Sequence, residues 1–163
     1  MCRLSDAPNL PDIPLQPRQP KRNRREGRNL VRSQQQQSGC VVVVAAIVEQ
    51  EDRLLVTERL PGTHLAGHWE FPGGKTEDGE DHRRCLEREM REELDVAVEI
   101  GGKILETSFA YPDRTVELHF YRCTLIGDPK PVLGQRLRWV SRAELGTLRF
   151  PPADLELIDL IGG

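Results

Sequence analysis

The sequence predicts a mixed α/β (α+β) fold in which helices pack on the faces of a mixed β-sheet. Residues 40–48 (CVVVVAAIV) form a β-branched run of strand length, typical of a strand buried on both faces. Residues 81–94 carry apolar side chains at helical spacing. The further strands and helices are interleaved without a regular strand–helix–strand repeat, which favours a mixed sheet over a parallel one.

The elements of the N-terminal half follow from turn residues between apolar runs. Residues 50–52 (QED) indicate a turn and residues 53–58 (RLLVTE) a return strand, so the first two strands form a hairpin. Residues 59–67 form a loop. Residues 69–71 (WEF) give a short extended piece, which Pro72 and the following glycines end.

The helix begins near Asp81, and its apolar stripe is Leu86, Met90 and Leu94, with Cys85 beside it. After it we expect an extended stretch over residues 96–107, interrupted by a glycine pair, and strands over residues 115–125 and 136–140. Ser141 caps a short turn, and a last helix opens at two prolines and runs to residue 160.

The chain of 163 residues is long enough for one domain, which we expect at residues 40–163. Residues 1–39 contain five prolines and a glutamine tract, and they predict a disordered tail. The tail has eight Lys/Arg and three Asp/Glu, so its net charge is +5 and the remainder carries −8 of the total −3. A solvated tail or a start-site artefact is favoured over a nucleic-acid or targeting patch.

The composition of the chain excludes several classes of protein. No run approaches the roughly 18 apolar residues of a membrane-spanning helix, and the four cysteines are too dispersed for zinc knuckles or a disulfide scaffold. We therefore expect a cytoplasmic protein with reduced thiols and no membrane partner. The acidic domain is also unsuited by charge to strong nucleic-acid binding, although it can hold a nucleotide through a cation.

Three carboxylates of the predicted helix, Glu89, Glu92 and Glu93, fall within one arc at about 100° per residue. Like charges at these spacings repel, and a bound cation would explain them. Gly73 and Gly74 precede the helix and would let a main-chain carbonyl approach a metal. Because Mg²⁺ prefers carboxylates, carbonyls and water, we predict a magnesium-dependent site for a nucleoside polyphosphate, with an ordinary charged helix as the alternative.

The stretch from residue 74 to residue 96 resembles the signature of the Nudix hydrolases. That pattern is Gly, five residues, Glu, seven residues, Arg-Glu, an aliphatic residue, any residue, Glu-Glu, any residue, Gly and an aliphatic residue. It is matched here by Gly74, Glu80, Arg88, Glu89, Met90, Glu92, Glu93 and Val96. The one departure is Asp95 where the family has Gly, at a position that favours a left-handed turn.

The resemblance implies an α/β/α sandwich around a mixed β-sheet and a divalent-metal pyrophosphohydrolase. The implied metal ligands are the Gly73 carbonyl, Glu89, Glu92 and Glu93. Glu89 is also a candidate for the base that activates water, and Arg88 and Glu80 would pair to orient the loop against the helix. The implied cofactor is Mg²⁺, with Mn²⁺ as an alternative.

Residues 68–75, 138–140 and 150–154 further resemble the MutT-type branch, which cleaves nucleoside triphosphates to a monophosphate and pyrophosphate. This branch implies substrate-binding roles for Arg59, Phe71, Lys75 and Asp154. Phe71 would line the base pocket and Asp154 would touch the base edge. An Asp carboxylate accepts hydrogen bonds, for instance from cytosine, whereas enzymes for oxidised guanine often have Asn there. Leu133 stands near where relatives place another acidic ligand, so the number of metals stays open.

The leading prediction is hydrolysis of modified or non-standard (deoxy)nucleoside triphosphates, 8-oxo-dGTP-like or cytidine nucleotides, in nucleotide-pool sanitation and DNA repair. The protein would act as a monomer or homodimer. Two alternatives remain: an ADP-ribose or nucleotide-sugar pyrophosphatase, and a Nudix-like module that binds a nucleotide or nucleic acid without hydrolysing it.

Overall fold

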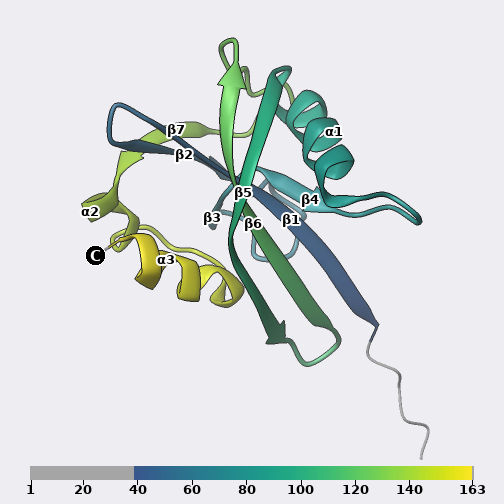
Figure 1. The fold of residues 1–163 in the computed structure, drawn as a ribbon. Coiled ribbons are helices and arrows are strands. Elements are labelled where there is room, and N and C mark those ends of the chain that lie inside the picture. Colours follow the sequence, from purple (N-terminus) through teal and green to yellow (C-terminus); the bar gives the residue numbers. More distant parts are fainter. Residues whose placement is uncertain (1–38, 163) are drawn as a thin grey trace, which may run out of the picture. The chain divides into compact units, whose positions relative to one another are not determined.

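A computed structural model describes residues 39–162 (Figure 1). The predicted disordered tail, residues 1–39, lies outside the described residues apart from Gly39. In chain order the elements are β1 (Cys40–Gln50), β2 (Arg53–Glu58), β3 (Trp69–Glu70), β4 (Gly73–Lys75), α1 (His82–Leu94), β5 (Ala97–Ala110), β6 (Thr115–Ile126), β7 (Leu137–Ser141), α2 (Arg142–Leu145), the 3-10 turn η1 (Pro152–Asp154) and α3 (Leu155–Ile161).

Strand β1 is shared by both halves of the sheet. Along one edge it pairs in parallel with β6, and β6 pairs antiparallel with β5. Along its other edge β1 pairs antiparallel with β4 and with the start of β2, and β2 also pairs with β3 and β7. The predicted mixed sheet is therefore confirmed.

The hairpin of β1 and β2 is confirmed as well. Gln50 pairs with Arg53, which leaves the two-residue turn Glu51–Asp52. Both turn residues have positive φ, 48° and 60°. Positive φ at both positions is the type I′ geometry, whose twist matches that of the flanking strands.

Two apolar layers form on opposite faces of the sheet because side chains alternate along β1. Val44, Ala46 and Val48 pack with the buried stripe of α1, whereas Ala45 and Ile47 pack with Phe120 and with apolar residues of α2 and α3. Figure 1 shows α1 and α3 on opposite sides of the β5–β6 pair. The expected sandwich, with helices on both faces of the sheet, is confirmed. No helix within residues 39–162 is long and apolar enough to cross a membrane.

Helix α1 has well-defined caps at both ends. The Asp81 side chain accepts a hydrogen bond from the Arg84 N–H at 3.0 Å, as an N-cap residue does. Asp95 closes the helix with φ 48°, and its N–H donates to the Arg91 carbonyl. The left-handed turn predicted at Asp95 is therefore present, in a residue type that adopts it at some cost.

The short extended piece does end before Pro72, since β3 stops at Glu70, but the sequence did not predict that the glycines after it begin a new strand. Residues 73–75 form strand β4, in which Gly74 lies opposite Val44 of β1. Gly73 has φ 152°, and a Cβ there would lie 2.1 Å from the Val44 carbonyl oxygen. The two strands approach so closely that only glycine fits, and the pairing depends on a strand some thirty residues earlier in the chain. The last predicted helix is likewise divided into η1 and α3.

Candidate active site

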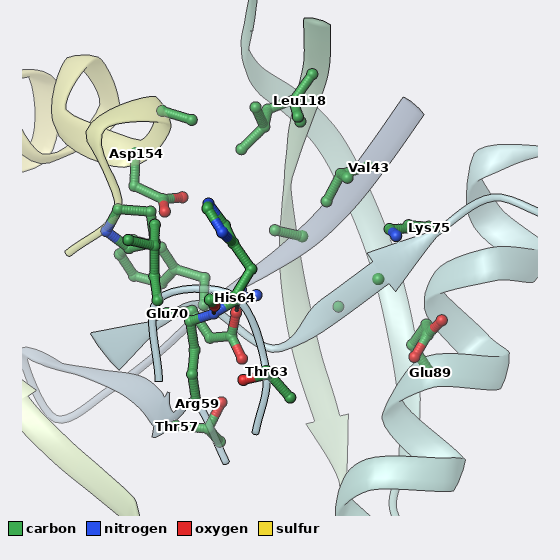
Figure 2. A pocket seen from close by; sticks show the side chains of 18 of the residues that line it. Val43, Thr57, Arg59, Thr63, His64, Glu70, Lys75, Glu89, Leu118 and Asp154 are labelled. Atoms are coloured by element: carbon green, nitrogen blue, oxygen red, sulfur yellow. Dashed lines mark hydrogen bonds and ion pairs between the residues drawn. The ribbon is translucent and has the colours of Figure 1, made fainter. Parts of the chain in front are cut away.

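A cavity of about 410 Å³ lies beside β1, with walls from β2, the loop after it, the β3–β4 segment, α1 and η1. This volume is in the range of about 300–1,000 Å³ typical of small-molecule sites. Figure 2 shows Asp154 at one end of the cavity and Lys75 and Glu89 at the other. The site is therefore elongated, with a different set of polar groups at each end.

The cavity brings together most of the site residues expected from the sequence. Its lining includes Arg59, Phe71, Gly73, Lys75, Glu89, Glu93 and Asp154. Glu80, Arg88 and Glu92 are not part of the lining. The first two lie behind Glu89, whereas Glu92 extends toward solvent with 58% of its side chain exposed.

Arg88, in the middle of α1, connects the helix to the loop that precedes it. Its guanidinium donates to both carboxylate oxygens of Glu80, at 2.8 and 2.9 Å, to Oε1 of Glu89 at 2.8 Å and to the Lys75 carbonyl at 3.1 Å. The hydrogen bonds from Arg88 lower the pKa of Glu80 to about 2. This planar, bidentate pairing fixes where Glu89 points.

The glycines leave room for the acidic end of the cavity. A Cβ at Gly74 would lie 2.3 Å from the Glu89 carboxylate, so any side chain at this position would displace that group. The backbone of Gly73 lies beside the Glu93 carboxylate and acts to lower its pKa. Strand β4 therefore lies against the inner face of α1.

Negative charge accumulates at this end. Burial, together with the carboxylates of Glu70 and Glu89, raises the pKa of Glu93 to about 8. Burial also raises the pKa of Glu89 and of Glu70, against the opposing effect of Arg88 and Arg59 respectively. Such a set of crowded carboxylate oxygens fits a hard divalent cation, which would neutralise the excess charge.

The structure does not gather all three predicted helix glutamates around one point. Glu92 approaches Arg88 at 3.4 Å and does not face the cavity. Within the described part of the chain, three metal-ligating side chains with ligand atoms all within 4.8 Å of one another occur elsewhere, at Glu106, Glu117 and His119. Helical spacing places the glutamates around the helix axis but does not fix their side-chain directions.

The opposite end of the cavity is apolar with a buried acid. The ring of Phe71 stacks on that of Phe150, with centroids 5.5 Å apart. Asp154 is 6% exposed, and burial, together with the Glu70 carboxylate, raises its pKa to about 7 despite the opposing charge of Arg59. At this pKa the side chain can act as a carboxylate or as a protonated acid close to neutral pH.

Sequence reasoning assigned no role to Glu70, Tyr111 and His64, which also line the cavity. Glu70 forms an ion pair with Arg59, whose Nε donates to the His64 carbonyl at 2.7 Å. The sequence feature that could have pointed to Glu70 is its place as an acid between two aromatic residues, Trp69 and Phe71, in a predicted short strand. Strand alternation turns such a residue away from the face that buries its neighbours.

Near Leu133 the structure shows a contact that sequence reasoning missed. Gln135 is buried, and its Nε2 donates to the Glu93 carbonyl at 2.9 Å while its Oε1 accepts from the Leu133 N–H at 3.0 Å. Leu133 and Gln135 both line the cavity. This loop therefore binds a carbonyl in the last turn of α1, close to the acidic end of the cavity.

Comparison with known proteins identifies the family. The family model described as NUDIX domain matches residues 43–160. An 8-oxo-dGTP diphosphatase of Haemophilus influenzae is 36% identical over 65% of this chain and 79% of its own length. A CTP pyrophosphohydrolase of Escherichia coli is 33% identical over 69% of this chain and 84% of its own length. The solution structure of the DNA mismatch repair protein MutT from methicillin-resistant Staphylococcus aureus superposes with a TM-score of 0.64, at 33% identity, over 77% of this chain and 97% of that one. The chain therefore belongs to the Nudix hydrolases, as a pyrophosphohydrolase of the MutT type.

Proposed function

We propose that this protein hydrolyses modified or non-standard (deoxy)nucleoside triphosphates, in a Mg²⁺-dependent reaction, to a nucleoside monophosphate and pyrophosphate. The observation that carries this proposal is the elongated cavity, with carboxylates at one end and Phe71 and Asp154 at the other. A nucleotide has the same two parts, a polyanionic chain and an aromatic base. The names of the relatives, an 8-oxo-dGTP diphosphatase and a CTP pyrophosphohydrolase, support the same substrate class.

At the acidic end we propose that the Gly73 carbonyl, Glu89 and Glu93 hold the metal, and that Glu92 joins them by turning its exposed side chain away from Arg88. The family uses divalent metal ions, and Mg²⁺ suits this all-oxygen donor set, with Mn²⁺ as the alternative. A bound ion supplies charge neutralisation of the phosphate oxygens and Lewis acidity.

The side chains around the metal position would carry the proton transfer and bind the phosphates. Arg88 holds Oε1 of Glu89, which leaves Oε2 as the atom to accept a proton from water. The cation Lys75 lines this end of the cavity and is exposed, in a position to bind the phosphate chain. Arg59 lines the wall of the cavity and would approach the nucleotide between its two ends.

At the apolar end we propose that Phe71 contacts the base and Asp154 reads its edge. As a carboxylate, Asp154 accepts a hydrogen bond from an exocyclic amino group such as that of cytosine. As a protonated acid it also donates, which matches the behaviour of an amide side chain. Because the pKa of Asp154 is raised to about 7, both forms contribute near neutral pH. Cytidine and oxidised purine nucleotides therefore both remain candidate substrates.

A substrate panel tests the proposal directly. The full chain is incubated with Mg²⁺ and with 8-oxo-dGTP, dGTP, CTP, a modified dCTP, ADP-ribose or a nucleotide sugar, and products are separated by chromatography. We expect one or more triphosphates to yield pyrophosphate and the monophosphate. Intact triphosphates together with cleaved ADP-ribose or nucleotide sugar would place the protein in the alternative branch. No cleavage of any compound would favour a binding module.

A further inference from the structure

A second cluster of metal-ligating side chains lies outside the cavity. It consists of His119 and Glu117 on β6 and Glu106 on β5, where Glu106 and His119 are directly paired across the two strands. None of the three lines the cavity, although Leu118 between them does. Alternation along β6 therefore places this cluster on the opposite face of the sheet, the face that α1 covers.

His119 is the buried member of the cluster, with only 5% of its side chain exposed. Its Nε2 lies 2.6 Å from Oε1 of Glu117. Since a carboxylate only accepts hydrogen bonds, this contact places a proton on Nε2, and the tautomer with that proton has a lone pair on Nδ1. A carboxylate bound to one ring nitrogen in this way commonly orients a histidine whose other nitrogen binds a metal.

Nδ1 of His119 makes no hydrogen bond to any residue of the described range 39–162. It faces Oε2 of Glu106 at 3.2 Å, close enough for an ion pair but in a direction that forms no hydrogen bond. The Nδ1 atom of the buried His119 ring thus lies beside a carboxylate oxygen of the exposed Glu106. A cation between the two atoms would be bound by both.

We propose that Nδ1 of His119 and the Glu106 carboxylate bind a divalent transition-metal ion, Zn²⁺, at a site separate from the catalytic one, with Glu117 orienting the histidine ring through Nε2. One ligand atom from each residue lies within 4.8 Å of the others. A tetrahedral zinc site with bonds of about 2.1 Å separates its ligand atoms by about 3.4 Å, which is close to the separation of Nδ1 and the Glu106 oxygen. A donor set that mixes imidazole with carboxylates favours Zn²⁺, whereas Mg²⁺ prefers oxygen alone.

Lys103 already forms an ion pair with the Glu106 carboxylate, and this contact gives the zinc proposal a further test. Its Nζ lies 2.6 Å from Oε2 of Glu106, so its ammonium group competes with a metal for that oxygen. The lysine side chain is 38% exposed and can move away into solvent. His82 and Tyr121 cover the cluster: the His82 ring lies 4.3 Å from that of His119, and its Nδ1 lies 2.8 Å from the Tyr121 hydroxyl.

The test is calorimetric titration of the full chain with Zn²⁺, after metal removal and in excess Mg²⁺ so that the catalytic carboxylates are already occupied. We expect one zinc site in the wild type and a loss of affinity of tenfold or more, on the order of that seen for altered metal shells, in Glu106→Gln and His119→Asn. Lys103→Met should bind Zn²⁺ more tightly than the wild type. Glu99→Gln, an exposed glutamate on the same strand, is the matched control and should bind as the wild type does.

Thermal unfolding of each variant is recorded with and without Zn²⁺, and Glu106→Gln remains decisive if His119→Asn fails to fold, because Glu106 is exposed. Zinc should raise the Tm of the wild type and not that of Glu106→Gln. Zinc binding that is equally strong in Glu106→Gln would come from thiols or the tail and would overturn the proposal. Failure of the wild type to bind Zn²⁺ would also overturn it.

Discussion

Glu93 is a half-buried carboxylate close to two other acids, Glu70 and Glu89, which raise its pKa. An uncompensated charge in such a place is costly to folding, and proteins retain it where it binds a ligand. The neutral amide of glutamine has nearly the same shape but repels neither neighbour. Substitution therefore separates the role of the charge in activity from its effect on stability.

We predict that Glu93→Gln lowers kcat by about 10²–10⁴-fold, the range for loss of a group that acts directly in the reaction, while its Tm without metal equals or exceeds that of the wild type. Steady-state pyrophosphate release and thermal unfolding in a chelator measure the two effects. Glu87→Gln, an exposed glutamate of the same helix, should match the wild type in both. Wild-type turnover in Glu93→Gln would remove this residue from the site.

Asp154 makes the stability of the domain depend on pH. Its ordinary pKa of 3.8 is raised to about 7 by burial and by Glu70. Between these two values the folded chain keeps a proton that the unfolded chain has lost, so this residue's contribution to stability falls as pH rises through that window. Arg59 opposes the shift, and Tyr111 is the other titratable group near Asp154.

Asp154→Asn should therefore gain stability relative to the wild type as pH rises from 5 to 8. Urea unfolding of both proteins in a chelator gives the difference, in which the titration of all other groups largely cancels. Asp128→Asn, at an exposed position, should show a constant difference from the wild type. A pH-independent difference for Asp154→Asn would show that Asp154 ionises normally.

At the level of elements, the two glycines of β4 have different neighbours, so substituting each of them should have a different effect. An added Cβ at Gly73 meets the backbone of β1, which cannot yield, whereas one at Gly74 meets the flexible end of Glu89. We predict that Gly73→Ala destabilises the domain by about 1–3 kcal/mol, and that Gly74→Ala lowers kcat with a smaller loss of stability.

Urea unfolding and pyrophosphate release measured on both variants check this division. Gly102→Ala is the control, because a Cβ at Gly102 has no neighbour within 4 Å, and it should change stability by less than about 0.5 kcal/mol. Equal losses of stability in the two β4 variants would contradict the prediction.

Elements that depend on local sequence were predictable, and those that depend on distant partners were not. Helix α1 and the β1–β2 hairpin follow from apolar spacing, caps and a turn, and the structure has both. Strand β4 forms because β1 lies beside it, and from the local sequence alone its glycines indicated the end of a strand. The same limit applies to the site, where the glutamates of one helix were foreseen but the contact of Glu70 with Arg59 was not.

At the level of the whole molecule, the described elements begin at Cys40 and the family match begins at residue 43. We predict that a chain starting at Gly39 folds with an unchanged Tm and keeps its kcat and KM, because no residue of the proposed site precedes Arg59. Circular dichroism and kinetics of the two chains, with a salt-dependent DNA-binding assay, decide the point. Loss of hydrolysis on truncation, or tight DNA binding by the full chain alone, would contradict the prediction and show that residues 1–39 have a function.

The position of β1 at the centre of the sheet has a consequence for synthesis of the chain. Its β2 and β4 partners follow within about thirty-five residues, but the parallel partner β6 begins at Thr115. A chain leaving the ribosome therefore exposes the CVVVVAAIV edge until β6 has cleared the exit tunnel, and such an edge promotes aggregation. Added chaperone should accordingly raise the soluble yield of the protein without any change in its sequence.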